Sequence, residues 1–293
     1  MIDYLYSFLL ALAFLAISRV GTKRYVLWPG LLIVLTLVHV NHLADHPFAR
    51  MVVICSVLLM GMKGIVLAEW GRYLTWPRWF AFTILWFGMD PTPFAAEKRK
   101  LRWKKDAMIG LSFLLVGLAL STVVAYMPTD SILIMFVPMS LGFHYGALRL
   151  LTAFWRMQGI AVRPLFRNPL LSRGLADFWA KRWNLSFSQM MARAVQRPLV
   201  SRLGKRPALF AVFLVSGLLH ELAITVPVQS GYGLPTLYFI LHGLVVLIEK
   251  PSWPLWFSRA LALLLVAAPL PFLFPPVFTE NVIRYTLNYL QIF

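Results

Sequence analysis

The amino-acid sequence predicts an all-α protein that crosses a membrane several times. Hydrophobic residues make up 60% of the chain, charged residues only 13%, and the mean hydropathy is +0.73. A soluble domain has about 25% charged residues, so this chain has too few polar side chains to cover a water-facing surface. Its apolar runs are continuous rather than alternating, which indicates membrane helices and not the strands of a membrane β-barrel.

Nine apolar runs are candidates to enter the membrane. A transmembrane helix needs about 20 apolar residues. Seven runs approach this length, namely 2–18, 50–69, 106–126, 131–152, 207–226, 234–250 and 254–276, and two are shorter, 25–38 and 76–90. We expect 76–90 to start and finish on one side of the membrane, as a re-entrant or interfacial segment. The expected architecture is about eight transmembrane helices plus interfacial or re-entrant helices.

The positive charge is concentrated in two segments. The formal net charge is +17, and most of it comes from residues 94–105 and 153–206, which contain one acidic residue each, Glu97 and Asp177. Basic segments between apolar runs are typical of cytoplasmic loops. They also attract anionic lipid headgroups or a polyanionic ligand such as the phosphates of a coenzyme. Charge alone permits a nucleic-acid partner, but no nucleic-acid-binding module is present, so we expect none.

Charge also predicts the sidedness of the loops. With 94–105 and 153–206 in the cytoplasm, the turns 127–130 and 227–233, which lack Lys and Arg, face the other side, and so does the 39–46 loop. The segment 153–206 mixes aromatic residues with arginines, which is typical of segments in the membrane interface. Within it, Trp179 and Trp183 are four residues apart, and we expect them to share a helix face.

Polar residues inside membrane spans are costly and are functional candidates by default. His220 stands 13 residues after Pro207, about 20 Å along a helix, past the middle of the membrane from the basic side. Glu221 follows it directly, but adjacent helical residues point about 100° apart, so Glu221 is not expected to orient the imidazole ring. For His144 and His242 two interpretations are equally favoured: a functional residue, or a histidine that bridges two helices by a hydrogen bond. Glu249 beside Lys250 suggests a local ion pair.

Several other chemistries find no support. The sequence after His220 lacks the second histidine of a zinc-binding helix, and no P-loop, dinucleotide fingerprint or nucleophile elbow is present. The single cysteine, Cys55, is expected to be a buried small apolar residue. His39, His42 and His46, with Asp45, form a polar loop, for which an interfacial role is favoured over metal binding. We predict no metal site.

Two motifs resemble one family. The segments Asp177-Phe-Trp-Ala-Lys-Arg-Trp-Asn-Leu185 and Phe213-Leu-Val-Ser-Gly-Leu-Leu-His-Glu-Leu222 are similar to the wax synthase branch of the membrane-bound O-acyltransferase superfamily. The resemblance extends to Trp86–Pro91 and Leu241–Glu249 and covers about residues 85–250. Ala180-Lys181 stands where that branch would have Gly and Arg. A Lys ammonium cannot form the two parallel hydrogen bonds that a planar Arg guanidinium makes to a phosphate.

The resemblance implies transfer of an acyl group from acyl-CoA to an alcohol in a chamber inside the membrane, giving wax esters or related lipid esters. His220 would be the general base for the acceptor hydroxyl, and Asn184 a supporting residue that positions the acceptor or stabilises the oxyanion. The expected acyl-CoA contacts are Arg163, Arg167, Arg173, Lys181 and Arg182. The expected substrate pocket comprises Phe178, Trp179, Trp183, Ser216, Glu221 and His242. Acyl-CoA would be a substrate, and no permanently bound cofactor is expected.

The expected organisation is one integral membrane domain over 1–293. It has N-terminal helices in 1–93, a family-like core in 94–250, and a C-terminal helix and tail in 251–293. The expected partners are acyl-CoA, a hydrophobic alcohol and membrane lipids. The alternatives are a sterol, terpenoid or other small hydroxyl acceptor and, more remotely, a transporter with a buried His/Glu path, which the absence of internal repeats disfavours. Short loops favour a bacterial inner membrane over the endoplasmic reticulum.

Overall fold

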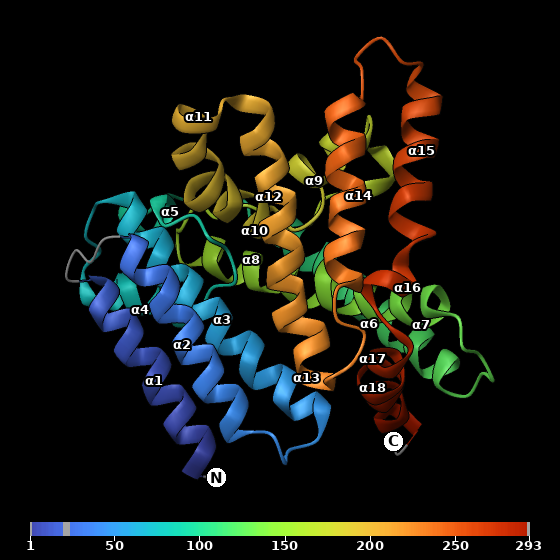
Figure 1. Ribbon diagram of the computed structural model, residues 1–293, viewed down its shortest axis with the longest axis horizontal. Coiled ribbons are helices and arrows are strands. Elements are labelled where there is room, and N and C mark those ends of the chain that lie inside the picture. Colours follow the sequence, from blue (N-terminus) through green and yellow to red (C-terminus); the bar gives the residue numbers. More distant parts are fainter. Residues whose placement is uncertain (1, 20–23, 292–293) are drawn as a thin grey trace.

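The computed structural model describes residues 2–19 and 24–291, which form helices and connecting segments without a β-strand (Figure 1). Within these residues, six helical stretches are long and apolar enough to cross a membrane: Ile2–Arg19, Pro47–Trp70, Lys104–Ala125, Ile132–Met157, Lys205–Val228 and Leu255–Leu273. Tyr25–Asn41 and Leu234–Ile248 are shorter apolar helices. The all-α, multi-pass membrane fold is therefore confirmed. A total of eight spans requires that both shorter helices also cross.

The longer helices are α1 (Ile2–Arg19), α2 (Arg24–Asn41), α3 (Pro47–Trp70), α6 (Lys104–Ala125), α12 (Lys205–His220), α14 (Leu234–Ile248) and α15 (Leu255–Ala267). The shorter ones are α4 (Trp76–Ile84), α5 (Thr92–Ala95), α7 (Ile132–Ser140), α8 (Leu148–Met157), α9 (Leu175–Lys181), α10 (Leu185–Met191), α11 (Arg197–Leu203), α13 (Val226–Val228), α16 (Leu270–Leu273), α17 (Pro276–Phe278) and α18 (Tyr285–Asn288). π-Helical turns occupy Leu141–Ala147, Ala192–Gln196, Glu221–Thr225 and Thr279–Arg284.

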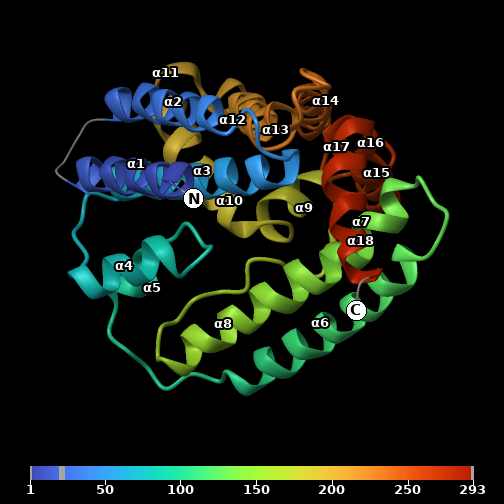
Figure 2. The ribbon, with the colours of Figure 1, turned by 90° about the horizontal axis from the view of Figure 1, so that it is seen from below.

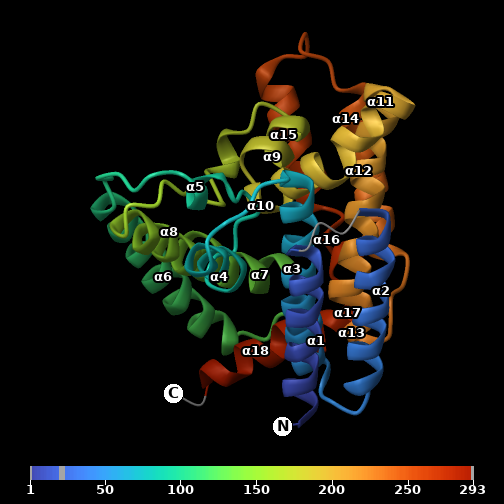
Figure 3. The same cartoon turned by 90° about the vertical axis from the view of Figure 1, so that its left-hand side faces the viewer.

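The helices form two groups. Helices α1, α2 and α3 pack against each other as one bundle, and α12 pairs with α14 beside it (Figure 1). Helices α6 and α8 lie apart from that bundle and lean away from α1 and α3 (Figure 3). Helices α9 and α10 lie between the two groups, in the centre of the view in Figure 2, and α11 lies at the edge, against α12. Helix α9 contacts α10, α14 and α15.

The loops gather at two ends of the molecule, and which end faces the cytoplasm stays a prediction from charge. At one end the basic segments meet: the Arg99 amide donates to the Gly159 carbonyl over 3.0 Å, and Arg259 Nε donates to the Ser172 carbonyl over 3.1 Å. At the other end His46 stacks on Tyr285, with ring centroids 4.1 Å apart. Arg284, next to Tyr285, donates to the Thr129 carbonyl over 2.9 Å, so the 39–46 loop and the 127–130 turn lie at the same end.

The basic segment begins later than the sequence suggested. Residues 153–157 belong to α8, the last part of the helical stretch Ile132–Met157, and 205–206 begin α12. The remainder is an extended loop followed by α9, α10 and α11, each of seven residues. Helices this short leave many backbone groups to be bound by other parts of the protein.

Helix α4 and the loop after it make up the segment 76–90, which we expect to be re-entrant or interfacial. With nine residues, α4 is about 14 Å long and cannot span a bilayer core of about 30 Å. Lys63 of α3 is fully buried and donates from Nζ to the carbonyls of Phe82, over 2.6 Å, and Gly88, over 2.9 Å. Trp155 Nε1 donates to the Leu85 carbonyl, and Ser186 Oγ to the Phe87 carbonyl. Non-helical backbone at membrane depth needs such partners, and the Ser186 bond ties this loop to α10.

Candidate active site

His220 lies at the last residue of α12, where the helix changes to a π-helical turn. Its Nδ1 atom is 2.7 Å from the carbonyl oxygen of Ser216, one turn earlier. A carbonyl oxygen only accepts, so Nδ1 carries the hydrogen, and Nε2 of the neutral ring keeps its lone pair. Nε2 has no hydrogen-bond partner among the residues that the structure describes. The imidazole is therefore oriented with one nitrogen held and the other available to accept a proton.

Two phenylalanine rings enclose the imidazole of His220. Phe239 of α14 lies 4.3 Å from it and Phe187 of α10 lies 5.3 Å from it, measured between ring centroids. Neither was predicted from the sequence, because the contacts join three helices whose approach is not visible in local sequence patterns. The only local signal was that Phe187 follows Asn184 by three residues.

Asn184 begins α10 and adopts the left-handed backbone conformation, with φ 43°. Its side-chain oxygen accepts a hydrogen bond from the Phe187 amide over 3.1 Å, an N-cap. Asn tolerates the left-handed conformation better than most residues. The cap fixes the first turn of α10 and so the backbone that carries Phe187 towards His220. The Nδ2 group of Asn184 donates to no other residue that the structure describes.

The three aromatic residues of the predicted pocket form one packed group. Phe178 stacks on Trp183, with centroids 5.8 Å apart, and Trp179 contacts Phe239 at 5.4 Å. Trp179 thereby joins the group to the ring next to His220. The expectation that Trp179 and Trp183 share a helix face is wrong: α9 ends at Lys181, and Trp183 lies in the turn before α10. The left-handed Asn184 separates the two helices.

The remaining pocket candidates are held by the protein itself. The Ser216 hydroxyl donates to the Val212 carbonyl, so this residue contacts His220 through its backbone. Glu221 accepts hydrogen bonds from the Gly233 and Thr236 amides and from the hydroxyls of Thr236 and Thr225. Its carboxylate thus caps the start of α14 and, as expected, does not orient His220.

His242 is fully buried and acts as a helix bridge. Nδ1 lies 2.8 Å from the Tyr238 carbonyl of its own helix and Nε2 lies 3.1 Å from the Leu265 carbonyl of α15. His144 has its Nδ1 2.9 Å from the Ser140 hydroxyl, and its ring lies 4.4 Å from Phe166 and 5.5 Å from Trp183. His242 therefore bridges α14 and α15, whereas the hydrogen bond of His144 stays within its own helical stretch.

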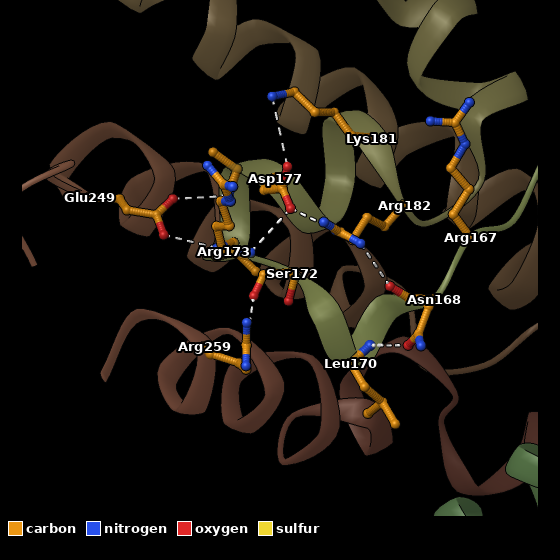
Figure 4. A network of polar contacts seen from close by, with 12 residues as sticks. Arg167, Asn168, Leu170, Ser172, Arg173, Asp177, Lys181, Arg182, Glu249 and Arg259 are labelled. Carbon is orange, nitrogen blue, oxygen red and sulfur yellow. Dashed lines mark hydrogen bonds and ion pairs between the residues drawn. The ribbon is translucent and has the colours of Figure 1, made fainter. Parts of the chain in front are cut away.

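The predicted acyl-CoA contacts differ in how they are held (Figure 4). Arg182 donates from Nε to Asp177 over 2.6 Å and from Nη1 to the Asn168 carbonyl over 3.2 Å. It therefore ties the end of α9 to the loop that precedes this helix. Lys181 is 73% exposed and lies 3.8 Å from Asp177. The other three arginines, Arg163, Arg167 and Arg173, are exposed. Four of the five basic side chains are therefore exposed, and Arg182 is held by Asp177 and Asn168.

Asp177 is the acidic centre of this network. Burial acts to raise its pKa, but the hydrogen bond from Arg182, the Arg173 amide and the charges of Arg182 and Lys181 outweigh burial, so the pKa is lowered. The carboxylate is the stable form at neutral pH, and it holds Arg182 in place.

Glu249 caps α9, and this corrects the expected ion pair with Lys250. Its two carboxylate oxygens accept hydrogen bonds from the amides of Leu175 and Ala176, each over 2.9 Å (Figure 4). A negative charge at the first turn of a helix satisfies free amides and is favoured by the helix dipole. The end of α14 thus positions the helix that carries Phe178 and Trp179.

Two histidines of the 39–46 segment, His42 and His46, have separate partners, whereas the buried Nδ1 of His39 has none among the described residues. His42 links the Ser7 hydroxyl, 2.9 Å from Nε2, to the Asp45 carboxylate, 2.6 Å from Nδ1. His46 accepts from the Phe48 amide and begins α3. Among the residues described, no three His, Cys, Asp or Glu side chains gather as a metal site would need. The arrangement is that of an ordered loop joining α1, α2 and α3.

Comparison with known proteins connects this site to one family. Residues 162–241 match the membrane bound O-acyl transferase family, and this segment contains His220, Asn184 and every other predicted site residue except His242. The chain is 33% identical over 141 residues to a probable long-chain-alcohol O-fatty-acyltransferase 2 of Arabidopsis thaliana, covering 45% of this chain and 37% of that protein. It is 30% identical over 100 residues to a long-chain-alcohol O-fatty-acyltransferase of Simmondsia chinensis, covering 31% of this chain and 28% of that protein.

A third relative has a different acceptor in its name. The chain is 28% identical over 150 residues to an acyl-CoA–sterol O-acyltransferase 1 of Arabidopsis thaliana, covering 45% of this chain and 44% of that protein. The matched regions span less than half the length of each of these three relatives. Over residues 162–241 the chain is thus similar to the membrane-bound O-acyltransferase superfamily, and the relatives support the predicted resemblance to its wax synthase-type branch.

Proposed function

We propose that this protein transfers a fatty acyl group from acyl-CoA to a long-chain alcohol, forming wax esters or related lipid esters within the membrane. The observation that carries the proposal is the orientation of His220 inside the family-matched segment, with Nδ1 bound to the Ser216 carbonyl and Nε2 available. The surroundings of the ring are apolar and aromatic, as a chamber for an acyl chain and an alcohol requires.

In the proposed reaction His220 acts first as a base and then as an acid. Nε2 takes the proton of the alcohol hydroxyl while the alcohol oxygen attacks the thioester carbonyl carbon. The carbon–sulfur bond of the resulting tetrahedral intermediate then breaks, and the imidazolium returns its proton to the departing thiolate. The products are an ester and free coenzyme A. The Ser216 carbonyl stabilises the imidazolium between these steps, because it accepts the hydrogen bond from Nδ1.

Asn184 supplies a hydrogen-bond donor to the same reaction in this proposal. Its oxygen is occupied by the α10 cap, which fixes the side chain and leaves Nδ2 free to donate. That group would bind the developing oxyanion or orient the acceptor hydroxyl. The loss of one oxyanion donor typically costs about 2.7–4 kcal/mol of transition-state stabilisation.

The polyanionic head of acyl-CoA would bind at the basic end of the molecule. Four of these basic side chains are exposed and would contact phosphates, namely Arg163, Arg167, Arg173 and Lys181, the last of which lies 3.8 Å from Asp177. Arg182 is bound to Asp177 and holds the loop next to them. Acyl-CoA is thus a substrate that enters from the basic, cytoplasmic side. We propose that this membrane is the bacterial inner membrane, because the loops between the spans are short; the relatives named above are plant proteins.

The test is ester formation by the purified protein. Palmitoyl-CoA is offered with a long-chain alcohol, a sterol or a diacylglycerol, and products are identified by mass spectrometry. We expect an ester with the long-chain alcohol. If only the sterol gave an ester, the proposed acceptor would change from a long-chain alcohol to a sterol, the acceptor in the name of the third relative. Release of coenzyme A without an ester from any acceptor would contradict acyl transfer to an alcohol.

A further inference from the structure

A small cavity lies at the basic end of the α1–α3 bundle, away from His220. It is bounded by the end of α1, the end of α3 with the loop that follows, and α4, and its volume is about 80 Å³. That volume is several times what one buried water needs. No residue of α9–α14, which carry the candidate active site, lines it.

The lining of this cavity is cationic. Arg19 of α1 and Arg72 of the loop after α3 belong to it, and there is no Asp or Glu among the described residues that line it. One Nη group of Arg19 donates to the Leu74 carbonyl over 3.0 Å, and its guanidinium lies 4.0 Å from the centre of the Trp76 ring. These contacts hold the guanidinium at the cavity, and its other N–H groups stay available because Arg has five donors.

A buried donor without a partner also lies here. Trp79 lines the cavity and is only 8% exposed, and its Nε1 makes no hydrogen bond to any residue that the structure describes. A buried N–H group without a partner costs free energy, and most such groups in native proteins are satisfied. The indole N–H and the two arginines call for the same kind of ligand, an acceptor with negative charge.

The cavity is at the depth of lipid headgroups. Two membrane helices, α1 and α3, end beside it, and the neighbouring Tyr73 and Trp76 are 74% and 64% exposed. Exposed Tyr and Trp at the ends of membrane helices are typical of the membrane interface. A phosphate at this depth is carried by a phospholipid.

We propose that this cavity binds the phosphate of an anionic phospholipid, held by Arg19, Arg72 and the indole N–H of Trp79. The acyl chains of the lipid would lie along the apolar surfaces of α1 and α3. The bound lipid would fasten α4 to the end of the α1–α3 bundle. Helix α4 leads into the loop that Ser186 binds, so the lipid supports the segment that packs against α10.

Native mass spectrometry of the delipidated full-length protein tests this site. The protein is titrated with phosphatidylglycerol, with phosphatidylcholine as the lipid without net charge, and separately with inorganic phosphate and coenzyme A. We expect one phosphatidylglycerol to be retained about tenfold more tightly than phosphatidylcholine, as charge-assisted hydrogen bonds to an unshielded anion predict. Inorganic phosphate or coenzyme A displacing that lipid would show a site for soluble phosphates and overturn the lipid assignment.

Matched variants locate the bound lipid. Arg19→Gln and Trp79→Phe should each weaken phosphatidylglycerol binding by about three- to tenfold. Lys100→Gln, which removes one charge from the exposed loop at the same end, and Trp256→Phe, on an exposed indole of α15, should leave it unchanged. Trp79→Phe keeps an aromatic side chain at this position, so this variant still tests the site if Arg19→Gln fails to fold. Equal binding of both lipids, or equal loss in the control variants, would refute the site.

Discussion

At the scale of single residues, backbone contacts prepare both candidate catalytic side chains. The Ser216 carbonyl selects the tautomer of His220, and the α10 cap fixes the Asn184 oxygen. In each case one polar atom is held by the protein and the other is left free. A side chain held in this way needs little reorganisation when substrate binds, which is the basis of electrostatic preorganisation.

The two roles of Asn184 can be separated by substitution. Asn184→Asp keeps an oxygen for the α10 cap but removes the Nδ2 donor, whereas Asn184→Ala removes both and places Ala in the left-handed conformation. We expect the Asp variant to retain thermal stability and to lose about 100-fold or more in turnover, since an oxyanion donor is missing. The Ala variant should also lose about 0.5–2 kcal/mol of stability with its cap. Normal turnover in the Asp variant would restrict Asn184 to capping.

Asp177 gives the basic loop a pH dependence. Its pKa is lowered in the folded protein by Arg182, the Arg173 amide and Lys181, against the effect of burial. A carboxyl with a lowered folded pKa contributes stability above its unfolded pKa of about 3.9 and loses it as pH falls through the lower folded pKa. Asp177→Asn should therefore lower the melting temperature at pH 7, and the difference from the wild type should shrink below about pH 4. A difference that stays constant with pH would show that the charge of Asp177 is not responsible; the exposed Glu97→Gln variant is the control.

At the scale of elements, the contact between α6 and the Leu141–Ala147 turn depends on glycine. A Cβ on Gly117 would clash with the backbone nitrogen of Gly142, whereas a Cβ on Gly142 would meet only atoms at 3.6–3.8 Å. Small residues let membrane helices approach closely. Gly117 thus allows α6 to lie directly against the Leu141–Ala147 turn.

This asymmetry predicts unequal effects of two alanine substitutions. Gly117→Ala should cost at least the roughly 1–3 kcal/mol of an overpacked core, because the clash is with backbone that cannot turn away. Gly142→Ala should be nearly neutral. Thermal unfolding of the two purified variants in the same detergent compares them. Equal stability of both variants would show that the helices can separate without loss.

The elements that the sequence predicted best are the long apolar ones. Spans such as 50–69 and 106–126 agree with α3 and α6 to within a few residues, because about 20 consecutive apolar residues have few other stable environments. The segment 153–206 was predicted poorly. A single left-handed residue, Asn184, divides α9 from α10, and the carboxylate of Glu249, 74 residues after Leu175, caps α9. Neither interaction has a local sequence signal.

The candidate site shows the same limit. His220 was recognised because a histidine and a carboxylate in an apolar run are unusual, and Asn184 because of its motif. Phe187 and Phe239 were missed, since apolar residues in apolar helices carry no mark of which neighbour they meet. Glu249 was assigned the wrong partner, because the adjacent Lys250 is obvious in sequence and α9 is not.

At the scale of the whole molecule, charge sets the orientation in the membrane. The loop with Lys98, Arg99 and Lys100 should face the cytoplasm, and the turn with Asp130 the opposite side. In a Cys55→Ala background, a membrane-impermeant maleimide should label Asp130→Cys in intact cells and Lys100→Cys only after lysis. Labelling in the reverse order would invert the orientation and with it the side from which acyl-CoA enters.

The central claim is that His220 removes the acceptor proton. The most direct measurement is the rate of ester formation from palmitoyl-CoA and a long-chain alcohol by purified wild-type, His220→Ala and His39→Ala proteins of equal thermal stability. His39 lies at the outer end of α2, far along the chain from the matched segment, and controls for the loss of an imidazole. We predict that His220→Ala forms no ester above background while His39→Ala matches the wild type. Wild-type turnover in folded His220→Ala would contradict the account.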